Sequence, residues 1–263
     1  VEMAGIDKNE IELVLVATIT PDMTFPSAAV IIQNRLEIEE AAAADISATC
    51  SGFLYGLSIA NQYIKTGEHK TILLVGADVL SSITDWKDRD TCILFGDGAG
   101  AVVIKQADNG RGILGTYTGI VTKKMDILKI PFGGSRHPLT PENIGDRQHF
   151  IQMEGKEVFK CAVLGMTKCI DKILKKCNLT EKDIALFIPH QANMRIIEAL
   201  AKRLSLPVEK VFVNLDKYGN TSAASIPIAL DEANRAGRIK SGDKVLMVSF
   251  GGGLTMASAI IQW

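Results

Sequence analysis

The segment Ala44–Ala60, with the sequence ADISATCSGFLYGLSIA, places a cysteine between a pattern of residues typical of a strand and one typical of a helix. Residues 44–49 predict a short strand that ends in a tight turn. A helix follows, because apolar residues recur at helical spacing until Gly67 ends it. These apolar residues are Phe53, Leu54, Leu57, Ala60 and Ile64. The N–H groups and dipole of a helix N-terminus favour a thiolate, so Cys50 is a candidate nucleophile.

A small buried core residue is the alternative interpretation of Cys50, and two other segments bear on the choice. His190 follows an apolar strand predicted at residues 184–188, and Asn220 follows a strand predicted at residues 210–214. All three residues therefore come just after the end of a predicted strand. Open α/β sheets place their chemistry at such ends, which favours the nucleophile.

Length and charge limit the class of protein. The chain has 263 residues, which is long for one compact domain and enough for two fused halves. A net charge of −1 gives no general attraction to nucleic acid or to an anionic membrane. No apolar run approaches the roughly 20 residues that span a bilayer, and residues 1–5 lack the features of a signal peptide. We therefore expect a cytoplasmic protein with neither a membrane nor a nucleic-acid partner.

The five cysteines are odd in number and lack paired spacing, which argues against a disulfide framework and fits a reducing compartment. Cys161, Cys169 and Cys177 are eight residues apart on one helix predicted at residues 154–177. Metal ligands on one helix are three or four residues apart, and no histidine accompanies these cysteines. We interpret them, and Cys92, as structural residues and predict no metal site.

The chain repeats itself. Residues 5–16 resemble residues 178–189, residues 70–75 resemble residues 243–248, and residues 95–104 resemble residues 250–260. Each repeat alternates strands with helices and closes with a glycine-rich hairpin, so an α/β fold of two related halves is predicted. We place the halves at residues 1–110 and 111–263.

The first half is short at its front. Ile184 follows Gly112, the start of the second half, by 72 residues, whereas Ile11 follows Val1 by ten. By symmetry we expect roughly 60 further residues, enough for one strand and one helix of ordinary length. Without them, one sheet edge would be open.

The glycines of residues 95–100, FGDGAG, could be mistaken for a phosphate-binding loop. Such a loop must open a helix, but the β-branched run Val102-Val103-Ile104 follows here. We therefore interpret these glycines as part of a hairpin and predict no nucleotide site.

Cys50, His190 and Asn220 suit acyl transfer through a thioester. A thiolate can attack an acyl thioester and hold the acyl group covalently. The tetrahedral intermediate then needs N–H donors aimed at its oxyanion, which the backbone of Cys50 and the run Gly251-Gly252-Gly253 can supply.

Neutral His190 and Asn220 side chains can each donate a hydrogen bond to one carbonyl oxygen. Two such donors stabilise the enolate that remains when a malonyl thioester loses carbon dioxide, so the pair suits decarboxylative condensation. The plainer alternatives are a turn residue at Asn220 and a surface-loop residue at His190.

These segments resemble the β-ketoacyl-acyl-carrier-protein synthase III family, the initiating condensing enzymes of bacterial type II fatty acid synthesis. The resemblance covers essentially the whole chain. It rests on residues 24–28 (TFPSA), the turn around Cys50, residues 95–100, residues 189–195 (PHQANMR), residues 219–222 (GNTS) and residues 251–253 (GGG). It implies the thiolase-like fold, in which two related α/β halves form a five-layered α-β-α-β-α sandwich.

The resemblance also implies roles. The family's catalytic cysteine, histidine and asparagine match Cys50, His190 and Asn220, and its second oxyanion donor matches Gly252. The expected reaction joins a short acyl group from acyl-coenzyme A to malonyl-acyl carrier protein through an acyl-cysteine. Coenzyme A and phosphopantetheine thioesters enter as substrates, and no resident cofactor is implied.

Three further residues match binding positions of the family. Asn193 matches an asparagine that contacts pantetheine, and Arg195 matches an arginine implicated in carrier-protein docking. Phe25 matches a phenylalanine that reaches into the neighbouring subunit's acyl pocket, which implies a homodimer. The family's tryptophan, arginine and threonine for coenzyme A lie at positions before Val1, so the resemblance gives no basis for tight coenzyme A binding by this chain alone.

Related functions were weighed against this one. A degradative thiolase carries a second cysteine near the terminal glycines, and residues 250–258 contain none. Elongating synthases use two histidines, and Asn220 occupies the place of one. A polyketide-type or 3-hydroxy-3-methylglutaryl-coenzyme A synthase shares the Cys-His-Asn set, and a non-catalytic thiolase-fold fragment is an alternative of another class.

Overall fold

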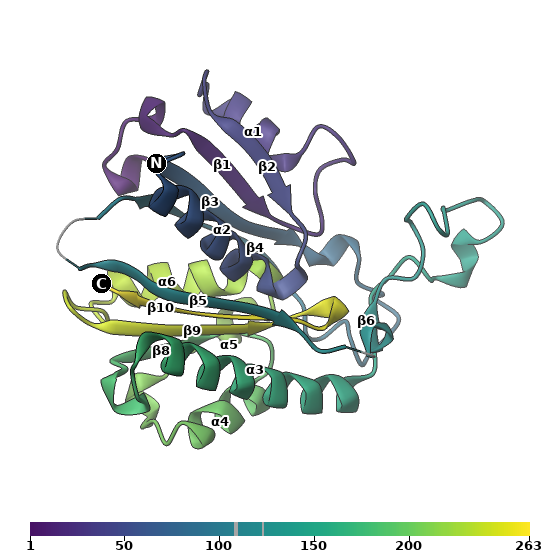
Figure 1. Cartoon of the computed structure of the whole chain (residues 1–263). Helices are drawn as coiled ribbons and strands as arrows, with labels where there is room; N and C mark the ends of the chain where they lie inside the picture. The colour runs from purple at the N-terminus through teal and green to yellow at the C-terminus, as the bar shows by residue number, and fades with distance from the viewer. Residues whose placement is uncertain (108–109, 123) are drawn as a thin grey trace.

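The computed structural model describes residues 1–107, 110–122 and 124–263. Two four-stranded sheets lie one above the other, with helices between them and on both outer faces (Figure 1). This arrangement gives five layers in the order helix, sheet, helix, sheet, helix. The predicted α-β-α-β-α sandwich is therefore confirmed.

The first sheet has the strand order β2-β1-β3-β4. Its strands are β1 (Leu13–Ala17), β2 (Ala42–Ile46), β3 (Thr71–Val79) and β4 (Asp97–Lys105). The strands β1, β2 and β3 are parallel, and β4 is antiparallel to β3. All five residues of β1 are buried, as expected for a central strand covered on both faces.

The second sheet has the order β5-β10-β9-β8. Its strands are β5 (Gly112–Ile120), β8 (Leu186–Pro189), β9 (Lys244–Phe250) and β10 (Thr255–Gln262). A small ribbon, β6 (Leu128–Lys129) with β7 (Gln152–Met153), holds the ends of a long loop that projects from the body of the molecule (Figure 1).

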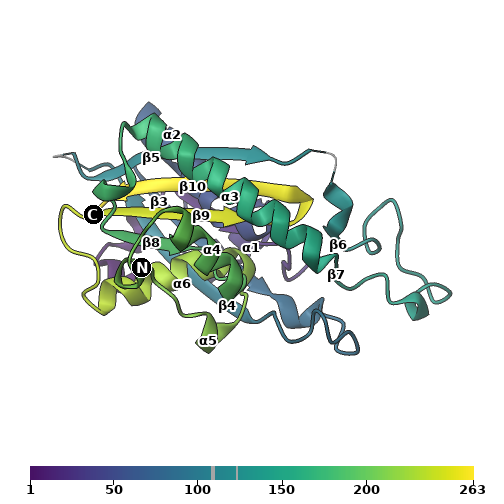
Figure 2. The same cartoon turned by 90° about the horizontal axis from the view of Figure 1, so that it is seen from below.

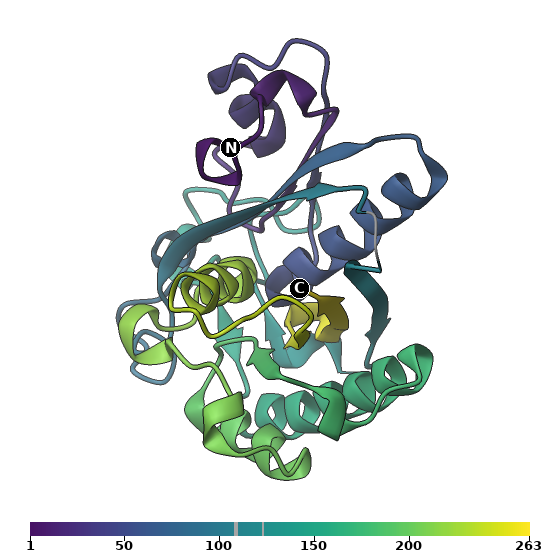
Figure 3. The same ribbon diagram turned by 90° about the vertical axis from the view of Figure 1, so that its left-hand side faces the viewer.

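Within the described residues, six α-helices form the other layers. They are α1 (Ala28–Arg35), α2 (Gly52–Thr66), α3 (Gly155–Cys177), α4 (Met194–Arg203), α5 (Leu215–Tyr218) and α6 (Ser225–Arg235). Helix α1 covers the outer face of the first sheet (Figure 1). Helix α3 covers the outer face of the second sheet, with α4 packed beside it (Figure 2). Helices α2 and α6 lie between the two sheets, as Figure 3 shows from the side.

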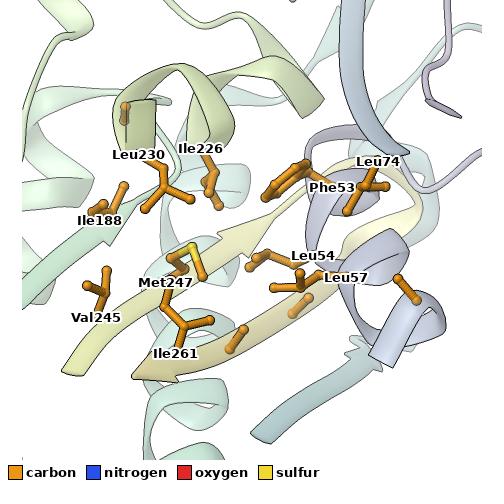
Figure 4. Close-up of a cluster of buried hydrophobic side chains, with 14 of the residues drawn as sticks. Phe53, Leu54, Leu57, Leu74, Ile188, Ile226, Leu230, Val245, Met247 and Ile261 are labelled. Carbon is orange, nitrogen blue, oxygen red and sulfur yellow. The ribbon is translucent and has the colours of Figure 1, made fainter. Parts of the chain in front are cut away.

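The main hydrophobic core fills the space between the sheets (Figure 4). Phe53, Leu54 and Leu57 of α2 enter it from one side, and Ile226 and Leu230 of α6 enter from the other. The periodic apolar face predicted for α2 is thus confirmed, and Gly67 ends this helix with a left-handed φ of 78°. Burial of this face fixes where the N-terminus of α2, and hence Cys50, must lie.

The predicted duplication appears in the details of the two sheets. A one-turn 3-10 helix with a capping box precedes β1, with Asp7 as its N-cap, and a matching one precedes β8, with Thr180 as its N-cap. In the first sheet, β1 pairs in parallel with β3, and β3 pairs antiparallel with β4. In the second sheet, β8 pairs in parallel with β9, and β9 pairs antiparallel with β10. The boundary between the halves near residue 110 stays a prediction.

One expectation about a strand was wrong. Residues 210–214 form a single parallel bridge between Val211 and Phe187, because the backbone then turns away and the N–H of Asn214 binds the side chain of Gln191. The glycines near residue 98 are part of a hairpin, as predicted, since they lie at the start of and within β4, which pairs antiparallel with β3. They also let the segment of residues 218–228 approach the face of β4. A Cβ on Gly100 would lie 2.9 Å from the backbone nitrogen of Ile228.

The two sheets differ at one edge. In the second sheet β5 covers the outer edge of β10, but no strand among the described residues covers the equivalent edge of β4. A groove of about 560 Å³ lies there, lined by residues 102–107 of β4 and its end, by α2 and by the chain's last residues. The open sheet edge expected from the sequence is therefore present.

Candidate active site

Cys50 lies in a 3-10 turn, Thr49–Ser51, that joins the end of β2 to the start of α2. Thr49 has a left-handed φ of 48°, which few non-glycine residues adopt. Its hydroxyl lies 2.9 Å from the carbonyl oxygen of Ala48 and 3.2 Å from that of Gly252, so it ties this turn to the terminal glycine loop. The predicted strand, turn and helix around the cysteine are confirmed.

Burial raises the pKa of the Cys50 thiol to about 11, and the negative charge of Asp78 adds to this effect. The nearby side chain of Ser222 and the backbone N–H of Cys50 itself act in the opposite direction but are weaker. The backbone N–H at this helix N-terminus thus acts in the expected direction, while burial of the charged sulfur opposes it.

His190 directly follows β8 and is 1% exposed. Its backbone N–H continues the sheet by donating to the carbonyl oxygen of Val248, at 2.8 Å. Its Nδ1 lies 2.6 Å from Oγ of Ser225. Burial lowers the pKa of the imidazole to about 4, so His190 is neutral at physiological pH. The alternative of a surface-loop histidine is excluded.

Asn220 is 8% exposed and is held by its own backbone. It pairs with Phe95 in an isolated bridge, its N–H donating to the Leu94 carbonyl oxygen at 2.9 Å. Its Oδ1 accepts a hydrogen bond from the N–H of Ser222, at 2.9 Å. Because the oxygen of the carboxamide is occupied in this way, the Nδ2 group remains to donate to a ligand.

One cavity of about 690 Å³ is lined by Cys50, His190 and Asn220 together. The three residues are far apart in the sequence and come from β2–α2, from the end of β8 and from the loop before α6. The cavity continues between α3 and α4, where Asn193 and Arg195 also line it. The sequence therefore predicted correctly that these residues share one space, while their chemical roles stay predictions.

A second, smaller pocket of about 210 Å³ opens on the other side of Cys50. Its lining is mainly apolar and includes Ile19, Leu80, Leu128, Ile130, Ile151 and Gly252. A Cβ on Gly251 would lie only 2.7 Å from the backbone nitrogen of Cys50, so the glycine run packs directly against the cysteine turn. This pocket can hold a short apolar group attached to the sulfur.

The remaining predicted residues lie at the mouth of the site or apart from it. Asn193 is the N-cap of α4, with its Oδ1 accepting from the N–H of Arg195 at 2.9 Å. The guanidinium of Arg195 is exposed and stacks over the ring of Phe159, 5.4 Å from its centroid. Phe25 is 83% exposed and lines none of the cavities described above.

Asp78, at the end of β3, was missed by the sequence reasoning. It is 2% exposed, and its Oδ1 accepts from the N–H of Ile19 at 2.8 Å and from the hydroxyls of Thr18 and Thr20. Its Oδ2 accepts from the N–H of Ala223, at 3.2 Å. This carboxylate thus ties the loop after β1 to the segment that carries Asn220. An acidic residue at the end of an otherwise apolar strand was the signal for it.

Five layers and a partly buried cysteine that shares one cavity with histidine and asparagine side chains define an acyltransferase of thiolase-like fold. A family model described as 3-oxoacyl-[acyl-carrier-protein (ACP)] synthase III matches residues 44–120, and the model of its C-terminal part matches residues 174–263. The chain belongs to the β-ketoacyl-[acyl-carrier-protein] synthase III family, the condensing enzymes that initiate fatty acid synthesis.

Individual relatives agree with this family. The chain is 53% identical to a β-ketoacyl-[acyl-carrier-protein] synthase III from Caldanaerobacter subterraneus, over 100% of this chain and 79% of that protein. The crystal structure of 3-oxoacyl-[acyl-carrier-protein] synthase III from Aquifex aeolicus superposes with a TM-score of 0.91 at 45% identity, over 100% of this chain and 80% of that one. The corresponding enzyme from Thermus thermophilus gives a TM-score of 0.88 at 43% identity, over 97% of this chain and 78% of that one.

Proposed function

We propose that this chain catalyses decarboxylative condensation of a short acyl-coenzyme A with malonyl-acyl carrier protein, through an acyl-Cys50 intermediate. The observation that carries the proposal is the shared lining of one cavity by Cys50, His190 and Asn220. Family membership supports the reaction class, and the neutral state of the imidazole supports its use as a hydrogen-bond donor.

In the loading step, the sulfur of Cys50 attacks the thioester carbon of acyl-coenzyme A. The new carbon–sulfur bond forms as the bond to coenzyme A breaks, and the thiol proton leaves with the coenzyme A thiol. The backbone N–H groups of Cys50 and Gly252 are proposed to bind the oxyanion. The acyl chain then occupies the smaller apolar pocket beside Gly252.

In the condensation step, the malonyl thioester loses carbon dioxide, and the electron pair of the broken bond forms an enolate. His190 Nε2 and Asn220 Nδ2 are proposed to donate to its oxygen. The enolate carbon attacks the acyl carbon, and the sulfur of Cys50 leaves and takes a proton from solvent. A β-ketoacyl-carrier protein is released.

The acyl carrier protein is proposed to dock at the mouth of the larger cavity. Arg195 is exposed there, and Lys156 and Lys160 of α3 line the same cavity together with the acidic residue Asp90, so basic residues predominate. Asn193 lies on the way inward and can bind the amides of a pantetheine arm. A basic rim complements the phosphate that links such an arm to its carrier.

A homodimer is proposed from the exposure of Phe25. A phenylalanine that is 83% exposed leaves a large apolar surface in water, and Met23 nearby is 49% exposed. Light scattering of purified protein, compared with a Phe25→Asp variant, tests the dimer. A monomeric wild-type protein would contradict it.

Cys50 and Asn220 are predicted to act in different steps of the reaction. Cys50→Ser should abolish acyl loading, because a serine hydroxyl is a much poorer nucleophile than the thiol it replaces. Asn220→Ala should mainly harm decarboxylation, by roughly 100-fold, as for removal of one donor at a developing oxyanion. Mass spectrometry after incubation with acetyl-coenzyme A measures loading, and release of carbon dioxide from malonyl-carrier protein measures decarboxylation.

A Cys161→Ser variant is the matched control, since Cys161 is a buried thiol of α3 away from the reacting groups. It should load one acetyl group, as the wild type does. Absence of any acetyl adduct on Cys50 in the wild type would favour a non-catalytic thiolase-fold chain. Loss of loading with intact decarboxylation in Asn220→Ala would overturn the assigned roles.

A further inference from the structure

Ser225 is the first residue of α6, and its hydroxyl oxygen lies 2.6 Å from Nδ1 of His190. Both residues are buried, with exposed fractions of 2% and 1%. No pattern in the sequence distinguishes this serine from its neighbours in the run residues 219–225. Its hydroxyl contacts a residue of the site that lies on another element, at the end of β8.

The hydrogen bond between the two side chains can run in either direction, and the surroundings decide between them. If Nδ1–H donated, the hydroxyl proton of Ser225 would need an acceptor of its own. Among the described residues, Oγ of Ser225 makes no hydrogen bond other than the one to His190. A buried donor without an acceptor is unfavourable, whereas unfilled lone pairs on an oxygen cost less. The serine hydroxyl is therefore the donor.

We propose that Ser225 is a positioning residue that donates its hydroxyl proton to Nδ1 of His190 and so holds the imidazole with its proton on Nε2. The proposal rests on the function proposed above, in which the ring must present an N–H to the thioester oxygen. Under this proposal, the Ser225 hydroxyl is the group that selects the tautomer of His190 with its proton on Nε2.

The remainder of the ring environment agrees with this assignment. Nε2 of His190 makes no hydrogen bond within the described chain, and His190 lines the large cavity. Since burial keeps the imidazole neutral, the position of the single proton decides whether the ring attracts or repels an enolate oxygen. With the proton on Nδ1, an Nε2 lone pair would face that oxygen.

Three variants test the proposal. Ser225→Ala removes the donor, Ser225→Thr keeps a hydroxyl, and Ser258→Ala is a matched control because Ser258 is equally buried but donates to the carbonyl oxygen of Cys169. We expect Ser225→Ala to lower the rate of decarboxylation roughly tenfold or more. This loss is smaller than the loss of roughly 100-fold or more that follows removal of an oxyanion donor itself, because the imidazole remains in place. Acetyl loading of Cys50 should change less than twofold, Ser225→Thr should restore decarboxylation, and Ser258→Ala should leave both steps unchanged.

Nitrogen-15 NMR of histidine-labelled protein provides a readout that does not depend on activity. The chain has four histidines, and a His190→Gln sample identifies the signals of His190. In the wild type the proton should lie on Nε2, and in Ser225→Ala a fraction of it should move to Nδ1. A wild-type proton on Nδ1, or decarboxylation by Ser225→Ala within twofold of the wild type, would overturn the proposal.

The two failures can be told apart. A wild-type protein that neither loads acetyl groups nor releases carbon dioxide would refute the proposed function, while the NMR spectrum would still report the tautomer. Intact catalysis with the proton on the wrong nitrogen would refute only the role of Ser225.

Discussion

At the scale of single residues, this site is built from groups kept neutral by burial. The thiol of Cys50 has its pKa raised and the imidazole of His190 has its pKa lowered, so neither carries a charge in the resting chain. The two pKa shifts run in opposite directions, so each residue has its own pH dependence.

Alkylation of Cys50 by iodoacetamide should accelerate about tenfold per pH unit from pH 7 to pH 10, because only the thiolate reacts and its pKa is about 11. A small reference thiol, with a pKa of about 8.5, should level off within this range. Peptide mass spectrometry resolves Cys50 from the other four cysteines. A Cys50 rate that levels off below pH 8 would show that the thiolate is stabilised after all.

His190 should make the fold sensitive to acid. An unfolded imidazole takes up a proton below pH 6.5, but the folded one does so only near pH 4, so the unfolded state binds more protons between these values. Stability therefore falls as pH falls through this window, by about 3 kcal/mol at pH 4. Urea unfolding at pH 7 and pH 4, compared between wild type and His190→Gln, measures this difference. Equal losses in both proteins would contradict it.

How far the sequence predicted the site depends on the range of the interactions. Cys50, His190 and Asn220 could be found because each follows a strand, and the ends of strands gather in this fold. Asp78 and Ser225 could not be assigned, because their contacts form only when β3 and α6 meet the loops of other elements. The effect of burial on the pKa of Cys50 could not be predicted either, because local helix geometry carries no information about burial.

At the scale of elements, β4 carries glycine where α6 passes closest. Gly98 and Gly100 each have a side chain or backbone of α6 within 3 Å of where a Cβ would be. The sequence predicted the hairpin to which these glycines belong, but it could not show that α6 packs against them. Short local patterns predicted the strands and helices well, and long-range packing decided the exceptions.

Gly100→Ala should destabilise the fold by about 1–3 kcal/mol, since the added methyl group would lie 2.9 Å from Pro227 and Ile228 and must push α6 away. Gly134→Ala is the control, because a Cβ there meets nothing within 4 Å. The midpoint of urea unfolding measures both. A Gly100→Ala midpoint equal to that of the control would mean that α6 moves at little cost.

At the scale of the whole molecule, the two halves share a plan but not a role. The first carries Cys50 just before α2, and the second carries His190 and Asn220. Asp78 of the first half and the N–H of Ala223 of the second join them beside the cavity. The duplication was visible in the sequence because matching strands keep matching apolar patterns.

No helix of the described residues is long and apolar enough to cross a membrane.

The edge of β4 stands where β5 covers β10 in the other sheet, so its backbone N–H and C=O groups can pair with one more strand. A short peptide that pairs with this edge should therefore protect the amide groups of β4 from hydrogen exchange.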